Sequence, residues 1–254
     1  MIPLYDRNPT RTTPVVTIIL MAACIAIYFF IQPHHTDVED AEFTYHRAAI
    51  PCELIQGGPI TEREVRTDDC SSSSESAPIF PDKNVYLAIL YSMFLHGSLM
   101  HLAGNMLFLW VFGNNIEDYL GKVKFVLFYF LGGLAATFAH VLTHLDSVSP
   151  GVGASGAVAA VMGAYLLLYP KARVSVLVTL FIFITVVQLS AVTVLGIWFL
   201  YQFLYAYQEA SVATGVAWMA HVGGFLFGLV GIFLLGGRPH RPAPAWDPRW
   251  GGYG

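Results

Sequence analysis

The chain has 254 residues, of which 56% are hydrophobic and only 12% are charged, and its net charge is −4. A soluble domain carries about 25% charged residues, so this composition excludes an ordinary soluble protein and predicts a polytopic membrane protein. The negative net charge and the absence of a basic stripe exclude a nucleic-acid reader. The high apolar content excludes intrinsic disorder and favours a lipid bilayer as the surroundings of the chain.

Six apolar segments follow one another and predict an all-α protein with six transmembrane helices. These spans are expected at residues 15–31, 86–113, 123–145, 154–169, 188–206 and 216–235. A long polar loop, 33–84, separates the first span from the second. The expected organisation is an N-terminal segment (1–14), a six-span domain (15–235) and a Pro-rich tail (236–254).

The stretch 174–187 is apolar but only 14 residues long, so we expect an interfacial or re-entrant segment rather than a span. Nine of the thirteen Lys and Arg residues lie before span one, between spans two and three, after span four or in the tail. The positive-inside rule then places both termini in the cytoplasm and the 33–84 loop outside. No transit peptide is recognisable, which favours a prokaryotic inner membrane.

Two of the three cysteines, Cys52 and Cys70, share the polar loop with 17 residues between them. A loop on the oxidising side of a membrane permits a disulfide, which would contribute about 3 kcal/mol to local stability. We therefore expect these two cysteines to be bonded to each other.

A few polar side chains lie inside the predicted spans, where such groups are costly and indicate function. They are His101, Asn105, Ser155 and His221. Spans two, four and six run in the same direction, so all four residues are expected at one depth near the outer face. His101 and Asn105 are four residues apart and therefore share one helix face.

Ser155 follows a glycine-containing loop and opens a helix, whose N-terminus favours developing negative charge. Small residues in spans four and six allow their backbones to approach closely. This packing would bring the Ser155 hydroxyl within hydrogen-bond reach of His221. A nucleophile, a base and oxyanion donors are the components of acyl transfer. No Asp or Glu lies in a span near His221, so a Ser–His dyad is expected, with no metal and no cofactor.

Four motifs occur in a fixed order along residues 15–235. They are His96-Gly-Ser-Leu-Met-His101-Leu-Ala-Gly-Asn105, the set Gly113, Glu117 and Gly121, then Gly153-Ala-Ser155-Gly156, and Ala220-His221-Val-Gly-Gly224 with Gly228. In this combination the chain resembles the rhomboid intramembrane serine proteases. The resemblance implies a six-helix core that hydrolyses peptide bonds in or near transmembrane segments of membrane-protein substrates.

The resemblance also implies roles for individual residues. Ser155 and His221 would form the catalytic dyad, and His101, Asn105 and the Ser155 amide would form the oxyanion hole. Span five, around Trp198, would gate the lateral access of substrates. The glycines that would support the site structurally are Gly153, Gly156, Gly224 and Gly228.

The chain departs from the family pattern at two places. Leu87-Ala88 stands where many members have a Trp-Arg pair, which bears on how the first loop is anchored. Ala159 stands where some members carry an aromatic residue that stacks on the catalytic His, which bears on the support of the His221 ring. Neither departure removes a reacting group.

Other polar residues have structural interpretations. His140 and His144 are four residues apart and resemble half of a zinc site, but no base and no fixed third ligand accompany them, so an interfacial His pair is favoured. His96 is expected to be a structural contact in the first loop or at the start of a helix. Glu117 is expected to cap or tie helices.

Two other functions stay open. A catalytically inactive relative would bind membrane helices without cutting them, and the retained Ser155 and His221 argue against it. A transporter or metal carrier would need polar residues across the full depth of the membrane. The inner halves of the spans are almost wholly apolar, which argues against that function.

Overall fold

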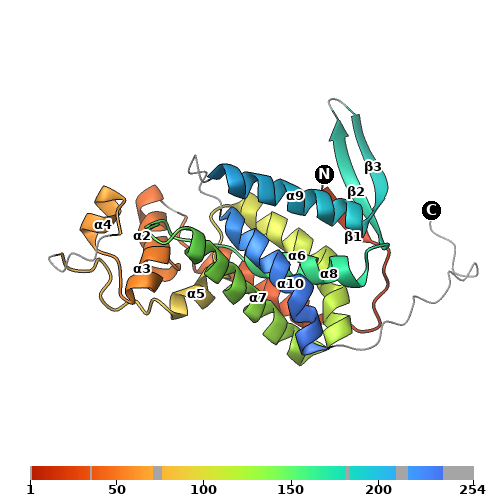
Figure 1. Cartoon of the computed structure of the whole chain (residues 1–254), viewed down its shortest axis with the longest axis horizontal. Helices are drawn as coiled ribbons and strands as arrows, with labels where there is room; N and C mark the ends of the chain where they lie inside the picture. The colour runs from red at the N-terminus through yellow and green to blue at the C-terminus, as the bar shows by residue number, and fades with distance from the viewer. Residues whose placement is uncertain (1, 35, 71–75, 181–182, 210–216, 237–254) are drawn as a thin grey trace, which may run out of the picture.

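The computed structural model describes residues 2–34, 36–70, 76–180, 183–209 and 217–236, and the described chain is mostly helical (Figure 1). The long helices are α1 (Val15–Phe30), α6 (Leu99–Leu120), α7 (Lys122–Thr143), α8 (Ser155–Leu168), α9 (Ala191–Glu209) and α10 (Trp218–Leu235). Shorter helices are α2 (Asp37–Arg47), α3 (Pro51–Gln56), α4 (Glu62–Thr67) and α5 (Leu87–Ser92). The predicted tail lies outside the described residues apart from Gly236.

Each of the six predicted apolar segments overlaps one long helix, but the bounds predicted for the second are wrong, because 86–113 holds the short α5 and only the first part of α6 (Leu99–Leu120). Among the described residues, α7 and α10 are long and apolar enough to cross a membrane, whereas α1, α8 and the stretch Ala191–Tyr205 of α9 are apolar but shorter. The helical core is therefore observed, and the crossing of the membrane by all six segments stays a prediction.

Helix α8 is the central element of the core, and its residues 156–165 are all buried. It packs directly on α10 through glycines on both helices. A Cβ atom added at Gly224 would lie 2.1 Å from the carbonyl oxygen of Gly156, and one added at Gly228 would lie 2.0 Å from that of Ala160. Only glycine permits this backbone-to-backbone contact, which explains the small-residue pattern of both segments.

Glu117 near the end of α6 holds the start of α1. Its carboxylate accepts hydrogen bonds from the backbone N–H groups of Val16 (3.0 Å) and Thr17 (2.8 Å) and from the Thr17 hydroxyl (2.8 Å). A carboxylate at a helix N-terminus satisfies orphan donors and complements the helix dipole. The expectation that Glu117 caps or ties helices is confirmed.

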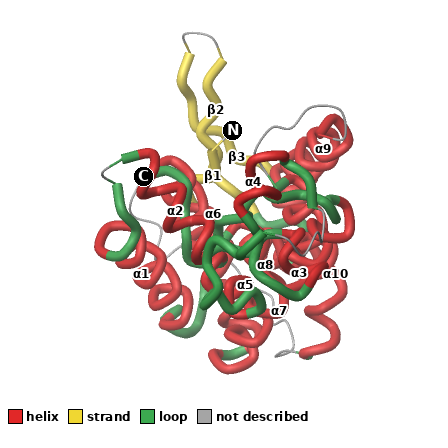
Figure 2. Tube along the Cα trace, turned by 90° about the vertical axis from the view of Figure 1, so that its left-hand side faces the viewer, coloured by secondary structure: helices red, strands yellow, loops and turns green. Residues whose placement is uncertain are grey.

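The all-α prediction is wrong in one region, because the chain also forms a three-stranded antiparallel sheet. Strands β2 (Arg173–Leu180) and β3 (Phe183–Ser190) pair as a hairpin over the stretch that was expected to be interfacial or re-entrant, and β1 (Ile2–Asp6) pairs with β2. Both hairpin strands are rich in Val, Ile and Thr, which favour extended backbone. Figure 2 shows the hairpin projecting away from the helices.

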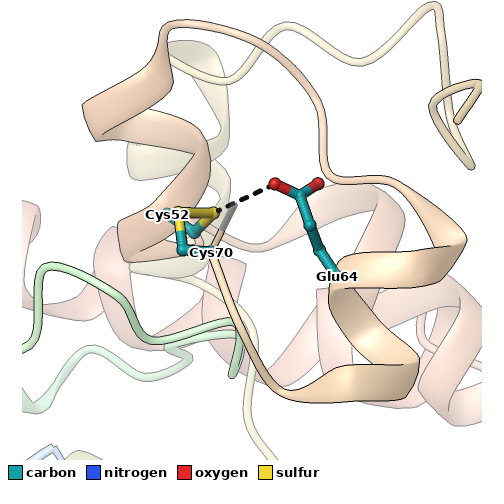
Figure 3. A group of neighbouring side chains, drawn as sticks. All are labelled: Cys52, Glu64 and Cys70. Carbon is teal, nitrogen blue, oxygen red and sulfur yellow. Dashed lines mark hydrogen bonds between the residues drawn. A yellow bond between two sulfur atoms is a disulfide. The ribbon is translucent and has the colours of Figure 1, made fainter. Parts of the chain in front are cut away.

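The described residues of the segment 33–84 (33–34, 36–70 and 76–84), here called the loop domain, lie at the opposite end of the helices from the sheet (Figure 1). Its small core contains Ile50, Cys52 and Ile60, and Val148 from the segment between α7 and α8 packs with them. The predicted disulfide between Cys52 and Cys70 is confirmed. Figure 3 shows Glu64 beside this disulfide, with 3.8 Å between a carboxylate oxygen and the Cys52 sulfur. A disulfide sulfur carries no proton and is not a thiolate, so this group lacks the free thiolates of a structural zinc site.

A buried ion pair ties α3 to the last residues of the loop domain, which directly precede α5. The Lys83 ammonium lies 2.5 Å from the Glu53 carboxylate and donates to the backbone oxygen of Tyr45 (2.6 Å), and Glu53 also accepts from the Ile60 N–H (3.0 Å). Burial raises the pKa of Glu53 and lowers the pKa of Lys83. Each charge therefore depends on the other for compensation.

The glycine contact between α8 and α10 predicts the effect of a single methyl group. Gly224→Ala should lower the free energy of unfolding by about 1–3 kcal/mol, because the helices must separate to admit the Cβ atom. Gly196→Ala in α9 is the matched control, because its Cβ atom would meet nothing within 4 Å. This control should be neutral or stabilising by up to about 1 kcal/mol. Denaturant or thermal unfolding in detergent measures both, and an equal response of the two variants would contradict the described packing.

The buried pair predicts a large effect of Lys83→Met. This variant leaves the Glu53 charge unpaired and should destabilise the loop domain by about 3–5 kcal/mol. Hydrogen–deuterium exchange at the Ile60 amide, which is bonded to Glu53, reports the opening free energy. Arg66→Met is the control, because the Arg66–Glu62 pair is exposed and should contribute less than about 1 kcal/mol. Unchanged exchange in Lys83→Met would show that the pair is not a stabilising element.

Candidate active site

The structure places Ser155 and His221 at the beginnings of two adjacent helices. Ser155 is the first residue of α8, and His221 lies in the first turn of α10. The Ser155 Oγ atom and the His221 Nε2 atom are 2.8 Å apart, within hydrogen-bond distance. The glycine contact between α8 and α10 therefore brings together a hydroxyl and an imidazole that are 66 residues apart in the sequence.

Gly153 shapes the loop that leads into Ser155. Its φ angle is +129°, a conformation that side chains rarely adopt, and a Cβ atom there would lie 2.8 Å from the His101 Nε2 atom and 3.4 Å from the Ser155 Oγ atom. The His101 ring thus lies beside the loop and close to the nucleophile. A side chain at position 153 would occupy the space between them.

His101 and Asn105 lie in the first two turns of α6. Ser98 caps this helix by accepting a hydrogen bond from the His101 N–H (3.1 Å), which fixes where the helix starts. Asn105 is 7% exposed, and its side-chain NH₂ group has no hydrogen-bond partner among the described residues. A buried donor of this kind is available to a group that binds at the site.

His96 ties the segment before α6 to the end of α1. Its backbone N–H donates to the Gln32 side chain (2.9 Å), and the Gln32 amide donates back to the His96 carbonyl (3.0 Å). The ring of His96 lies edge-on to that of His101, with 5.3 Å between ring centroids. These contacts agree with the structural interpretation of His96.

A third side chain, which the sequence patterns did not single out, contacts the His–Ser pair. The Nδ1 atom of His221 lies 2.8 Å from the side-chain oxygen of Gln202, which lies on α9 and is 6% exposed. A carboxylate is the usual orienting group for such a histidine, and the sequence has no Asp or Glu in a span near His221. The signal that would have found Gln202 is an amide inside the apolar segment 188–206.

The ring of His221 lies between two tryptophans. Trp198 of α9 lies 6.0 Å from it and Trp218 of α10 lies 6.1 Å from it, both measured between ring centroids, and Trp218 meets the ring edge-on. Ala159 is fully buried and offers no ring. The aromatic contacts of His221 therefore come from α9 and α10 instead of α8.

A cavity of about 60 Å³ opens beside Ser155. Its lining includes Ala136 of α7 and Gly156 of α8. Ala49 and Pro51 of the loop domain also line it. The Ser155 side chain therefore lies beside a space large enough for a few water molecules. His140 also lines this cavity.

His140 and His144 contact each other at the end of α7, with 4.5 Å between ring centroids. The Nδ1 atom of His144 lies 2.9 Å from the Thr143 hydroxyl and 3.2 Å from the His140 carbonyl oxygen. A nitrogen committed to these local contacts is less available as a metal ligand. The two rings pack against each other as an interfacial His pair would, while the buried Nδ1 atom of His140 has no hydrogen-bond partner among the described residues.

Comparison with known proteins agrees with the motifs. The family model of the rhomboid domain matches residues 83–238. Presenilin-associated rhomboid-like protein A, mitochondrial, of Danio rerio is 30% identical over 148 residues, and its counterpart in Mus musculus is 32% identical over 146 residues. Each alignment covers 56% of this chain and 36% of the relative. Rhomboid protein 1, mitochondrial, of Saccharomyces cerevisiae is 35% identical over 92 residues, 35% of this chain and 27% of the relative.

The matches therefore span about a third of the length of these relatives. They also contradict one expectation. A prokaryotic inner membrane with both termini in the cytoplasm was expected, and this is wrong, because these relatives are mitochondrial proteins by name. The absence of a recognisable transit peptide was too weak a signal to assign the membrane.

The matched domain includes both Ser155 and His221 and covers more than half of the chain. The chain therefore belongs to the rhomboid family.

Proposed function

We propose that this chain is an intramembrane serine endopeptidase that cuts peptide bonds in or near transmembrane segments of membrane proteins. The observation that carries the proposal is the 2.8 Å contact between the Ser155 hydroxyl and the His221 imidazole at the start of α8. Membership of the rhomboid family supports the same reaction class. The mitochondrial relatives favour a mitochondrial membrane as its location.

The reaction begins when His221 Nε2 takes the proton of the Ser155 hydroxyl and the oxygen attacks the scissile carbonyl carbon. The tetrahedral intermediate collapses as the protonated imidazole gives its proton to the leaving amine. The acyl-enzyme that remains is an ester of Ser155. A water molecule activated by His221 then hydrolyses this ester and restores both side chains.

Three donors are placed for the negative charge that develops on the carbonyl oxygen. Ser155 is the first residue of α8, so its backbone N–H has no acceptor within the helix. The Asn105 amide is buried and has no partner among the described residues, and the His101 ring lies beside Gly153. In a low-dielectric site such preorganised donors stabilise the transition state more than they would in water.

Substitution of the dyad tests this proposal. Ser155→Ala and His221→Ala should each abolish cleavage of a transmembrane reporter substrate in detergent or liposomes, and the double variant should be no worse than either, because the two residues act as one unit. Asn105→Ala should retain activity lowered by roughly 10–1,000-fold, as expected for the loss of one oxyanion donor. Gel-based kinetics with the purified proteins measures the cleavage rates of these four variants against the wild type.

Ser149→Ala is the matched control, because Ser149 is an exposed hydroxyl in the loop before α8 and should have wild-type activity when replaced. A chelator should not inhibit, since the proposed mechanism uses side chains alone. Wild-type cleavage by Ser155→Ala, or inhibition by the chelator, would refute the serine mechanism and return attention to His140 and His144.

A further inference from the structure

The proposed reaction requires one particular tautomer of His221. The Nε2 atom must be unprotonated to accept the Ser155 proton, so the proton of the neutral ring must reside on Nδ1. In serine hydrolases with a triad, a carboxylate accepts a hydrogen bond from Nδ1–H and so selects this tautomer. In a dyad without an acceptor at Nδ1, nothing selects the tautomer that carries its proton on Nδ1.

The structure supplies an acceptor at this position. The Gln202 Oε1 atom lies 2.8 Å from His221 Nδ1, and the Gln202 side chain is buried at 6% exposure. A carbonyl oxygen only accepts hydrogen bonds, so the proton of this contact belongs to Nδ1. The Ser155 contact at Nε2 is also 2.8 Å. The three side chains therefore form one chain, Gln202–His221–Ser155, in which each polar contact has a defined direction.

We propose that Gln202 is a positioning residue that fixes the tautomer and the ring orientation of His221, and that the site works as a Ser155–His221–Gln202 triad. This inference rests on the proposed function. A neutral amide does here what a carboxylate does elsewhere without the cost of placing a charge among apolar helices. The expectation of a dyad without an orienting group is thereby refined.

Gln202 lies on α9, which packs on its neighbours less closely than α8 and α10 pack on each other. Ser155 and His221 lie on α8 and α10, which are in backbone contact, whereas a Cβ atom at Gly196 of α9 would meet nothing within 4 Å. The outer side of α9 carries large apolar side chains that are about half exposed, namely Leu200, Tyr201, Phe203 and Leu204. Helix α9 is thus packed on one side only, at the edge of the helices (Figure 2).

The rings of α9 bring Gln202 to His221. Phe199 stacks on Phe225 of α10, with 4.5 Å between ring centroids, and Trp198 contacts both Phe225 and His221. Any displacement of α9 from α10 removes the acceptor from Nδ1 at the same time. Helix α9 must therefore stay against α10 for the His221–Gln202 bond to persist.

Two substitutions of Gln202 separate its acceptor from its bulk. Gln202→Met keeps the length of the side chain and removes the acceptor, and Gln202→Glu keeps an acceptor and removes the donor. We expect Gln202→Met to lower kcat by about 10–100-fold with KM changed less than about 2-fold, a smaller loss than the ~10⁴-fold cost of the wrong tautomer in a carboxylate triad. Gln202→Glu should recover kcat to within about 10-fold of the wild type, since a carboxylate accepts from Nδ1–H.

A spectroscopic readout tests the tautomer without relying on cleavage. In protein labelled with ¹⁵N-histidine, His221 of the wild type should show a protonated Nδ1 and an unprotonated Nε2. Gln202→Met should show a mixture of both tautomers, and Gln202→Glu should keep the wild-type pattern. His221→Ala assigns the signal. Phe203→Leu, a neighbour on the exposed side of α9, is the control and should leave the pattern unchanged.

The outcomes distinguish this inference from the proposed function. If the wild type cleaves and Gln202→Met keeps both its kcat and its tautomer, the positioning role is overturned while the peptidase stands. Equal losses in Gln202→Met and Gln202→Glu would also overturn it, because they would indicate a role in packing alone. If the wild type does not cleave, the proposed function fails, and the ¹⁵N spectra still decide whether Gln202 selects the tautomer.

Discussion

The backbone contact between α8 and α10 is the constraint on which the site depends. Gly156 and Gly224 face each other so closely that a methyl group on Gly224 would overlap a carbonyl oxygen of α8. In surroundings that give helices no hydrophobic drive to associate, close backbone packing of this kind is a main source of attraction. Ser155 lies one residue before Gly156, and His221 lies three residues before Gly224, so the contact that joins the helices also sets the distance between the Ser155 hydroxyl and the His221 imidazole.

Some polar side chains in the helical core satisfy groups of a neighbouring helix. Glu117 satisfies the start of α1, and Gln202 satisfies the Nδ1 atom of His221. The amide of Asn105, like the hydroxyl of Tyr129, is buried and has no partner among the described residues. Unsatisfied buried donors are rare and costly. In the proposed mechanism that cost is offset when the oxyanion of the substrate accepts a hydrogen bond from Asn105. This hydrogen bond is present in the transition state and absent from the resting enzyme, so it lowers the activation barrier.

The sequence was sufficient to predict features that depend on a short stretch of residues or on a regular spacing. The helical segments followed from apolar length, the Cys52–Cys70 disulfide from two cysteines in one polar loop, and the role of Glu117 from its glycine neighbours. The approach of Ser155 to His221 also followed from small-residue spacing, because glycine faces on two helices can pack in few ways. The catalytic roles of these residues stay a prediction.

Features that depend on long-range pairing were not predicted. Residues 174–187 were judged by length as a segment of a helical protein, whereas their β-branched residues pair across a hairpin and then with β1, at the other end of the sequence. Gln202 was missed because its role depends on how α9 lies against α10, which no spacing rule reports. The aromatic support of His221 was sought at position 159 of α8 and is provided by Trp198 and Trp218.

The central claim is that Ser155 is a nucleophile activated by His221. Its most direct test is the reaction of the purified protein with a fluorophosphonate probe, followed by mass spectrometry of the labelled peptides. The account predicts one covalent adduct on Ser155, which is lost in His221→Ala although the serine is still present, and is unaffected by a chelator. Labelling of Ser155 that proceeds equally well without His221, or an active protein that carries no adduct on Ser155, would contradict it.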